Sequence, residues 1–194
     1  MCTTKEQIHN YWQNPSSENM PSEYLKGTER SQYLVNLFKR FAKLDNSILE
    51  IGCNSGRNLA ALFAAGYHNL NGIEINSEAV RLLKETYPQL SNIPIYNSPV
   101  EDIITNFGEY DIIFTLALLE HIHPESEWIF EHIAYITRHH LLTIEDEKDR
   151  NSWRKFPREY KPIFIKYGFK HYNLGHLPDK KNYIIRLFRR LNWR

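Results

Sequence analysis

Small and polar residues interrupt an apolar run at EIGCNSGRN, Glu50 to Asn58. Gly52 can turn the chain at a dihedral angle that a β-carbon would resist. Gly56 lets the backbone or a ligand approach the start of the next segment, whose helical spacing offers unpaired amides and a partial positive charge. A plain strand-to-helix turn is the alternative, but the pattern favours a turn that holds a ligand.

The spacing of the glycines argues against a phosphate-binding loop. A P-loop needs G-x-x-x-x-G-K-[ST], which the sequence lacks, and the dinucleotide fingerprint needs G-x-G-x-x-G where this chain has G-x-x-x-G. A second acid, Glu74, ends the next apolar segment, GIEI. An acid at the tip of a second strand can accept hydrogen bonds from both hydroxyls of a ribose. Together the turn and Glu74 predict a nucleoside site.

Alternating strand-like and helix-like segments position these residues. We expect strands at 47–51, 69–75, 93–97, 110–116, 140–145 and 182–188, and helices at 57–65, 77–87, 100–107, 125–136 and 159–167. Such alternation predicts an α/β fold, a Rossmann-like doubly wound sheet of mostly parallel strands with helices on both faces. Ligands bind at the carboxyl ends of the strands in such sheets, which is where the turn after Ile51 falls.

The residues from about Ser47 to Glu145 resemble the class I S-adenosylmethionine-dependent methyltransferases. LEIGCNSGRNL resembles the first motif of that family, GIEIN the second, SPVEDI the third and YDIIFTLALLEHI the fourth, in the family's order. The first motif usually reads acid-x-G-x-G-x-G. Here Asn54 replaces the middle glycine, and asparagine tolerates left-handed backbone. The resemblance implies a seven-stranded sheet and S-adenosylmethionine as cofactor.

The resemblance also implies a role for each matching residue. Glu50 and the Gly52–Gly56 turn would face the methionine part of the cofactor, with Glu50 acting through water on its ammonium group. Glu74 would hold the ribose hydroxyls, and Ile75 would pack on the adenine. The residues implied for the cofactor are Glu50, Gly52, Asn54, Ser55, Gly56, Asn58, Glu74, Ile75, Pro99, Val100 and Glu101 at the adenine edge, and Leu116 and Ala117 beside the methionine part.

Methyl transfer needs a base only where the acceptor must lose a proton. His121 and His123, in LLEHIHPES, are the candidates because histidine titrates near neutral pH. The alternative is that these histidines only shape the cofactor pocket. In TIEDEKD, one of Glu145, Asp146 and Glu147 could bind a cationic or hydroxylated substrate, with Glu145 our choice. We expect no metal site.

The N-terminal segment, 1–45, is predicted to be a helical cap, with helix, polar loop and second helix, on a methyltransferase domain of 46–194. Tyr11, Trp12, Tyr24 and Arg30 are candidates for closing the pocket, Tyr11 and Tyr24 toward the substrate. Aromatic rings attract a sulfonium through cation–π interaction, and Arg30 could pair with the cofactor carboxylate. Core packing is the alternative for at least one of them.

Composition narrows the class of protein. A net charge of +1 gives no electrostatic case for nucleic-acid binding, and no apolar run approaches the ~20 residues that cross a bilayer. Two cysteines, Cys2 and Cys53, are too few for a disulfide framework, so we expect a cytoplasmic protein. The basic C-terminal segment KKNYIIRLFRRLNWR is interpreted as a final strand bearing exposed arginines rather than as a lipid-binding surface.

The sequence therefore predicts a cytoplasmic methyltransferase that transfers a methyl group from S-adenosylmethionine to oxygen or nitrogen of a small-molecule acceptor. Two other classes of protein stay open. One is a nicotinamide-dependent oxidoreductase, and the other is a non-catalytic module that binds S-adenosylmethionine or a protein partner. The acceptor and the oligomeric state stay open as well.

Overall fold

The computed structural model describes residues 3–191 and divides into two compact units. Among the described residues, one unit comprises 9–100, and the other comprises 3–8 together with 101–191. Cys2 lies outside the described residues.

Three parallel strands form the sheet of the 9–100 unit. They are β1 (Ile48–Ile51), β2 (Leu70–Glu74) and β3 (Ile95–Asn97), in the order β3-β2-β1. Ile51 pairs with Ile73, and Glu74 pairs with Asn97. All four residues of β1 are buried, as expected for an apolar run covered on both faces. The register places the ends of β1 and β2, and hence the turn after Ile51, at the same edge of the sheet.

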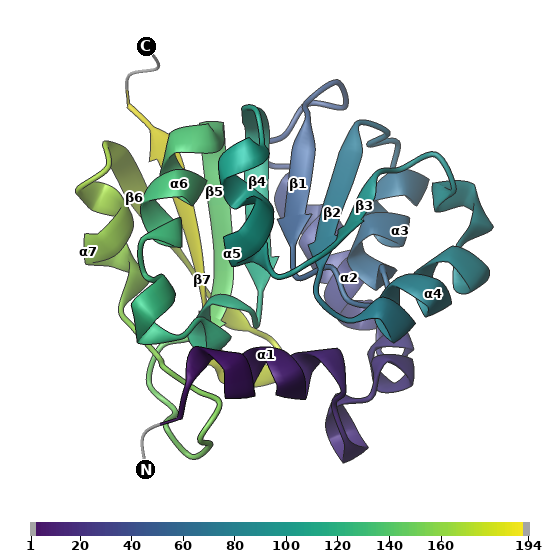
Figure 1. Cartoon of the computed structure of the whole chain (residues 1–194). Coiled ribbons are helices and arrows are strands. Elements are labelled where there is room, and N and C mark those ends of the chain that lie inside the picture. The colour runs from purple at the N-terminus through teal and green to yellow at the C-terminus, as the bar shows by residue number, and fades with distance from the viewer. Residues whose placement is uncertain (1–2, 192–194) are drawn as a thin grey trace. The chain divides into compact units, whose positions relative to one another are not determined.

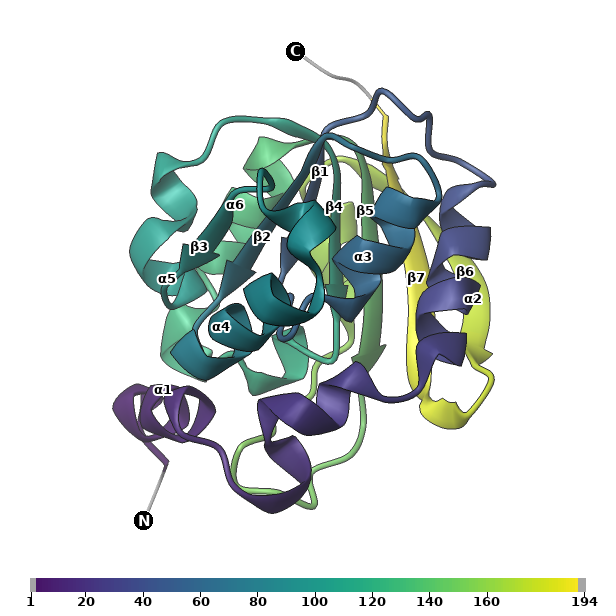
Figure 2. The same ribbon diagram turned by 90° about the vertical axis from the view of Figure 1, so that its right-hand side faces the viewer.

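The helices of this unit follow the spacing of the apolar residues. They are α2 (Thr28–Phe38), α3 (Arg57–Ala64) and α4 (Ser77–Thr86), and α2 packs beside α3 (Figure 2). Asn76 caps α4 by accepting from the Ala79 amide at 2.9 Å, and the helix ends before Pro88. Before α2, the polar loop contains two short 3-10 turns, η1 (Ser17–Asn19) and η2 (Pro21–Leu25), which follow α1 (Lys5–Gln13). A third such turn, η3 (Pro88–Leu90), follows α4.

Four strands form the sheet of the other unit, in the order β4-β5-β7-β6 (Figure 1). They are β4 (Tyr110–Leu116), β5 (Thr137–Asp146), β6 (Phe169–Leu177) and β7 (Lys180–Arg190). β4 and β5 are parallel, whereas β7 runs antiparallel to both β5 and β6. The helical elements are α5 (Val100–Ile103), η4 (Ile104–Asn106), η5 (Leu119–His121), η6 (Pro124–Ser126), α6 (Ile129–Ile136) and α7 (Tyr160–Ile165).

The elements differ from the sequence-based expectation in several places. The helix expected at 100–107 is divided into α5 and the 3-10 turn η4. Residues 168–174, GFKHYNL, lie outside every strand and helix expected from the sequence, but residues 169–174 are part of β6 because β6 pairs along its length with β7. The helix expected at 125–136 begins only at Ile129, since Pro124–Ser126 forms its own 3-10 turn. The final strand is confirmed, but the expectation that its arginines are exposed is wrong for Arg186. Arg186 is 7% exposed because Glu147 accepts two hydrogen bonds from its guanidinium.

Within the described part of the chain, no helix combines the length and the apolar character that a bilayer crossing requires.

Candidate active site

The turn after β1 alternates left-handed and ordinary backbone. Gly52, Asn54 and Gly56 have φ angles of 79°, 45° and 78°. The Gly52 and Cys53 amides both donate to the Ile73 carbonyl, at 2.8 and 3.0 Å, which ties the turn to β2. Asn54 takes the left-handed conformation that the family's middle glycine would take, and its Oδ1 accepts from the Ser55 amide at 2.7 Å. The substitution of asparagine therefore preserves the shape of the turn.

Gly56 is required by helix packing as well as by its dihedral angle. A β-carbon at this position would lie 2.4 Å from Cγ of Leu83, in α4. The glycine thus lets the start of α3 approach α4 closely. The sequence indicated a close approach at Gly56 but did not identify the neighbour.

Glu50 is a buried carboxylate with one oxygen unpaired. It lies in β1 and is 1% exposed, and its Oε1 accepts from Nδ2 of Asn58 at 2.8 Å. Its Oε2 is buried without a hydrogen-bond partner. Burial raises the pKa of Glu50 to about 8, against the lowering effects of the Asn58 hydrogen bond and the Arg57 charge. A buried acceptor of this kind costs free energy unless a ligand or water pairs with it, so it fits a cationic group such as the cofactor's ammonium.

Glu74 joins the turns that follow β1 and β2. Its Oε2 accepts from the Asn54 amide and its Oε1 from the Asn76 amide, each at 2.8 Å. Burial raises the pKa of Glu74, while these amides act in the opposite direction. Each carboxylate oxygen has a second lone pair. Glu74 can therefore hold the two turns and still accept hydrogen bonds from ribose hydroxyls.

Asn97 fixes the backbone beside Glu74, although no motif in the sequence singled it out. Its Nδ2 donates to the carbonyls of Glu74 and Ile75, at 2.9 and 3.2 Å. The Ser98 amide also donates to the Glu74 carbonyl, at 3.0 Å. The implied adenine-edge residues, Pro99, Val100 and Glu101, follow directly, with Val100 and Glu101 opening α5. The only sequence signal for Asn97 was an asparagine at the last position of an expected strand. Asparagine is common at such positions for other reasons, so this signal did not indicate a role in the site.

Tyr11 and Tyr24 are brought together by a residue that the sequence did not single out. Nδ2 of Asn19 donates to the Tyr11 hydroxyl at 2.9 Å, and the Tyr24 hydroxyl donates to Oδ1 of Asn19 at 3.1 Å. The Trp12 ring packs edge-on against Tyr11, with centroids 5.3 Å apart. Arg30 lies in α2 and is half-buried. Asn76 also links the N-terminal segment to the turn after β2, since its Nδ2 donates to the carbonyls of Trp12 and Gln13.

In the unit that contains residues 101–194, Leu116 and Ala117 end β4. Ala117 has a φ of 56°, unusual for a residue with a side chain, and its amide donates to the Ile144 carbonyl at 2.9 Å. The hydrogen bond ties this strained position to β5. The backbone therefore turns sharply where the fourth motif was expected to face the cofactor.

His121 and His123 follow Ala117 in different environments. Nδ1 of His121 donates to the Arg154 carbonyl at 2.9 Å, and burial lowers its pKa to about 4. Nε2 of His123 donates to the Thr3 carbonyl at 2.9 Å, and its Nδ1 accepts from the Glu125 amide at 3.2 Å. Both ring nitrogens of His123 are thus committed to the backbone.

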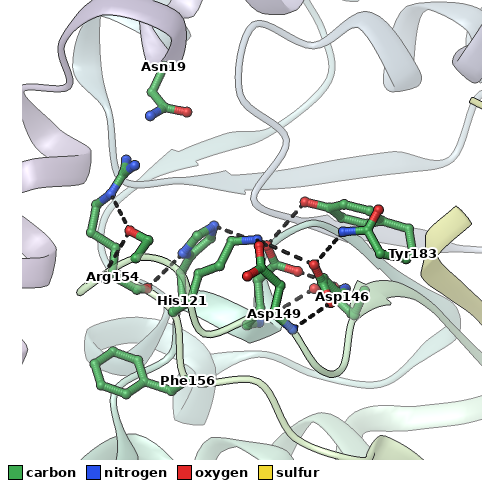
Figure 3. Close-up of polar contacts among 12 residues, drawn as sticks. Asn19, His121, Asp146, Asp149, Arg154, Phe156 and Tyr183 are labelled. Atoms are coloured by element: carbon green, nitrogen blue, oxygen red, sulfur yellow. Dashed lines mark hydrogen bonds and ion pairs between the residues drawn. The ribbon is translucent and has the colours of Figure 1, made fainter. Parts of the chain in front are cut away.

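Glu120 is a buried carboxylate whose Oε1 lies 3.6 Å from Nε2 of His121. Figure 3 draws the polar contacts of this region and labels His121, Asp146 and Tyr183 among them. Oε1 of Glu120 lies 3.3 Å from Nζ of Lys155 and accepts from the Tyr183 hydroxyl at 3.1 Å, and its Oε2 accepts from the Asp146 amide at 2.7 Å. Lys155 also pairs with Asp146 at 3.4 Å. The cluster joins the turn after β4, the end of β5 and the loop after it.

The three acids at the end of β5 and directly after it have separate surroundings. Glu145 is fully buried, one of its oxygens has no hydrogen-bond partner, and burial together with the Glu120 charge raises its pKa. Asp146 accepts from the Lys148 and Asp149 amides, and Glu147 pairs with Arg186. Among residues 3–191, no group of three or more metal-ligating side chains is arranged to hold an ion.

Comparison with known proteins shows that part of the chain is similar to a known family. Residues 48–140 match the family model described as a methyltransferase domain. No curated protein sequence matches the chain significantly.

Solved structures extend the likeness to the fold of the whole chain. Magnesium protoporphyrin IX methyltransferase from Synechocystis PCC 6803, with bound S-adenosylhomocysteine, matches with a TM-score of 0.76 at 14% identity, over 96% of this chain and 100% of that one. An O-methyltransferase family protein from Burkholderia thailandensis matches with a TM-score of 0.67 at 12% identity, over 96% of this chain and 63% of that one. TehB from Haemophilus influenzae matches with a TM-score of 0.63 at 17% identity, over 82% of this chain and 62% of that one.

The fold is thus the seven-stranded mixed α/β sheet of Rossmann-like methyltransferases. The methyltransferase-domain match over residues 48–140 and this fold support a class I S-adenosylmethionine-dependent methyltransferase, with S-adenosylmethionine as its cofactor.

Proposed function

We propose that this methyltransferase transfers a methyl group to an oxygen or nitrogen atom of a small-molecule acceptor. The binding of the cofactor is supported by one observation above all. The buried Oε2 of Glu50 has no hydrogen-bond partner, and Glu50 lies in the same unit as the left-handed turn and Glu74. The acceptor class is supported by the Synechocystis protein, which matches nearly all of this chain and whose name states a porphyrin substrate. Cytoplasmic location is part of the proposal, supported by the free, buried thiol of Cys53.

The residues of this chain would hold and orient the cofactor. When bound, S-adenosylmethionine supplies a methyl group on a positively charged sulfur. Glu50 would attract the ammonium group, Glu74 would accept from the ribose hydroxyls, and Pro99, Val100 and Glu101 would border the adenine. Positioning of the two reactants can supply effective molarities on the order of 10⁵–10⁸ M. Methyl transfer therefore needs few catalytic groups beyond those that position the cofactor and the acceptor.

His121 is the residue that we propose as base where the acceptor must lose a proton. His123 is less suited because both of its ring nitrogens bond to the backbone. The lowered pKa of His121 keeps its ring neutral at neutral pH. A neutral ring is the form that accepts a proton. Glu145, Tyr11 and Tyr24 are proposed for the acceptor, Arg30 for the cofactor carboxylate, and residues 1–45 as the cap of the site.

The test is a screen of small hydroxylated and amino compounds, porphyrins included, for release of S-adenosylhomocysteine. We expect turnover on at least one compound and none on nucleic acid. With that acceptor, His121→Asn is expected to reduce kcat about 10²–10⁴-fold, the usual contribution of a general base. His123→Asn is its control. Cofactor binding without release on any acceptor would contradict the proposal and favour a non-catalytic binding module.

A further inference from the structure

A chain of hydrogen bonds connects the start of α2 to Glu50. Nε of Arg57 donates to Oγ of Ser31 at 3.0 Å, and the Ser31 hydroxyl donates to Oδ1 of Asn58 at 2.7 Å. Nδ2 of Asn58 then donates to Oε1 of Glu50 at 2.8 Å. Arg57 also donates from its Nη1 to the Lys26 carbonyl, just before α2.

These hydrogen bonds can be oriented in only one way, because Arg57 at their start can only donate. A guanidinium can only donate, so Oγ of Ser31 must accept from Arg57 and turn its own proton toward Asn58. Oδ1 of Asn58 accepts that proton, which leaves the amide nitrogen facing Glu50. The opposite orientation would place the amide oxygen against a carboxylate, where two acceptors meet without a proton between them.

Burial makes this orientation matter. Ser31 is 2% exposed, Asn58 8% and Glu50 1%, so water does not readily replace a lost contact. Asn58 occupies one oxygen of Glu50, and the other, Oε2, is the buried atom without a partner. The series of hydrogen bonds therefore ends at Glu50, where Oε1 accepts from Asn58 and Oε2 is available to a ligand.

We infer that Ser31 is a positioning residue for the cofactor: it fixes the Asn58 amide so that the second oxygen of Glu50 is presented to the cofactor's ammonium group. This inference rests on the proposed contact between Glu50 and that group. Ser31 lies in the N-terminal segment, outside the four family motifs, and touches Glu50 only through Asn58.

The pH dependence of binding distinguishes positioning from general support of the fold. Burial raises the pKa of Glu50 to about 8, the Asn58 hydrogen bond and the Arg57 charge lower it, and the Glu74 charge raises it. Cys53, whose own thiol pKa is raised by burial, also lies in the field of Glu50 and Glu74. Loss of a well-oriented Asn58 donor must raise the pKa of Glu50 further. The ionised carboxylate that attracts an ammonium then forms only at higher pH.

The experiment measures S-adenosylhomocysteine binding to the full chain by calorimetry. The pH is varied from about 5.5 to about 8.5, which extends below and above the ordinary pKa of an α-amino group. For Ser31→Ala we expect about tenfold weaker binding at neutral pH, comparable to one hydrogen bond to a charged group. We also expect the acid limb of the affinity profile to move to higher pH. Deprotonation of the ligand's own ammonium group lowers the affinity of all variants alike. The affinity of each variant is therefore compared with that of the unchanged protein at the same pH.

Two further variants complete the test. Ser31→Thr keeps the hydroxyl and is expected to restore the profile of the unchanged protein. Thr143→Val is the matched control, because Thr143 is fully buried and its hydroxyl has no hydrogen-bond partner. Its affinity is expected to stay within about twofold, since no donor to a charged group is removed. If Ser31→Ala does not fold, Arg57→Lys keeps a positive charge while removing the Nε donor, and the same upward shift is expected.

Unchanged affinity in Ser31→Ala, or an equal loss at every pH, overturns the inference and leaves the proposed methyl transfer standing. Weak binding in Ser31→Thr overturns it as well. Failure of the unchanged protein to bind S-adenosylhomocysteine would instead remove the cofactor assignment, and with it both proposals.

Discussion

Two buried glutamates carry most of the chemistry proposed for the cofactor, and their partners differ. Glu74 receives two backbone amides, which fix it between two turns. Glu50 receives one side-chain amide and keeps one oxygen unpaired. Motif spacing identified both acids. It could not identify Ser31, Asn76 or Asn97 as residues that hold the site. Each has a side-chain hydrogen bond to a segment distant in sequence, and many folds use serine and asparagine on the surface.

Glu74→Gln is the substitution that tests the ribose assignment. An amide nitrogen would replace one acceptor oxygen and face the Asn54 or Asn76 amide, so one hydrogen bond of the turn is lost together with the charge. We expect affinity for S-adenosylhomocysteine to fall about 10- to 100-fold, since hydrogen bonds to charged groups contribute about 1.5–3 kcal/mol each. Calorimetry measures the loss.

Glu78→Gln is the control for that measurement. Glu78 also carries a carboxylate, but it lies on the exposed face of α4 and pairs with Arg81. Its substitution should leave the affinity unchanged. Equal affinities for the two variants would show that Glu74 does not contact the cofactor.

At the scale of elements, the turn between β1 and α3 depends on close packing between helices. Gly56, the N-cap residue of α3, has a left-handed φ of 78°, and a β-carbon there would lie 2.4 Å from Cγ of Leu83. We expect Gly56→Ala to destabilise the protein by about 2–4 kcal/mol, because dihedral strain and overpacking act together. Urea unfolding measures this change.

Gly108→Ala is the matched control. A β-carbon at Gly108 would meet no atom within 4 Å, and its φ is not left-handed. Its free energy of unfolding should change by less than about 0.5 kcal/mol. A similarly small effect for Gly56→Ala would contradict the packing described here.

The elements themselves follow the sequence closely where apolar spacing is strong. The strands at β1, β2 and β4 and the helices α3 and α4 lie within a few residues of the expected ranges. β6 was missed because its alternation of exposed and half-buried residues is irregular, and pairing with β7 stabilises it. The exposure of Arg186 was misjudged for a related reason, since its partner Glu147 lies in a loop that only the fold brings near.

At the scale of the whole molecule, buried ionisable groups make the free energy of unfolding depend on pH. Burial holds the pKa of Glu145 well above the ordinary 4.5 of a glutamate, so the folded state binds its proton more tightly than the unfolded chain does. The resulting stability is fully present below pH 4.5 and is lost as the pH rises through about 8. His121 acts in the opposite sense. Its pKa, lowered from 6.5 to about 4, gives stability that is present above pH 6.5 and lost as the pH falls toward 4.

Glu145→Gln separates these two contributions, because glutamine keeps the shape of the side chain and does not ionise. At about pH 5 the variant and the unchanged protein should have similar Tm values. At about pH 8.5 the variant should melt about 3–6 °C higher, the shift expected from one to two kcal/mol in a protein of this size. Scanning calorimetry across this range measures the difference, and Glu131→Gln, at an exposed position of α6, should show none at either pH. A Glu145→Gln variant that melts lower than the unchanged protein at alkaline pH would mean that the Glu145 carboxylate is stabilised as a charge, and the neutral carboxyl inferred from its burial would be wrong.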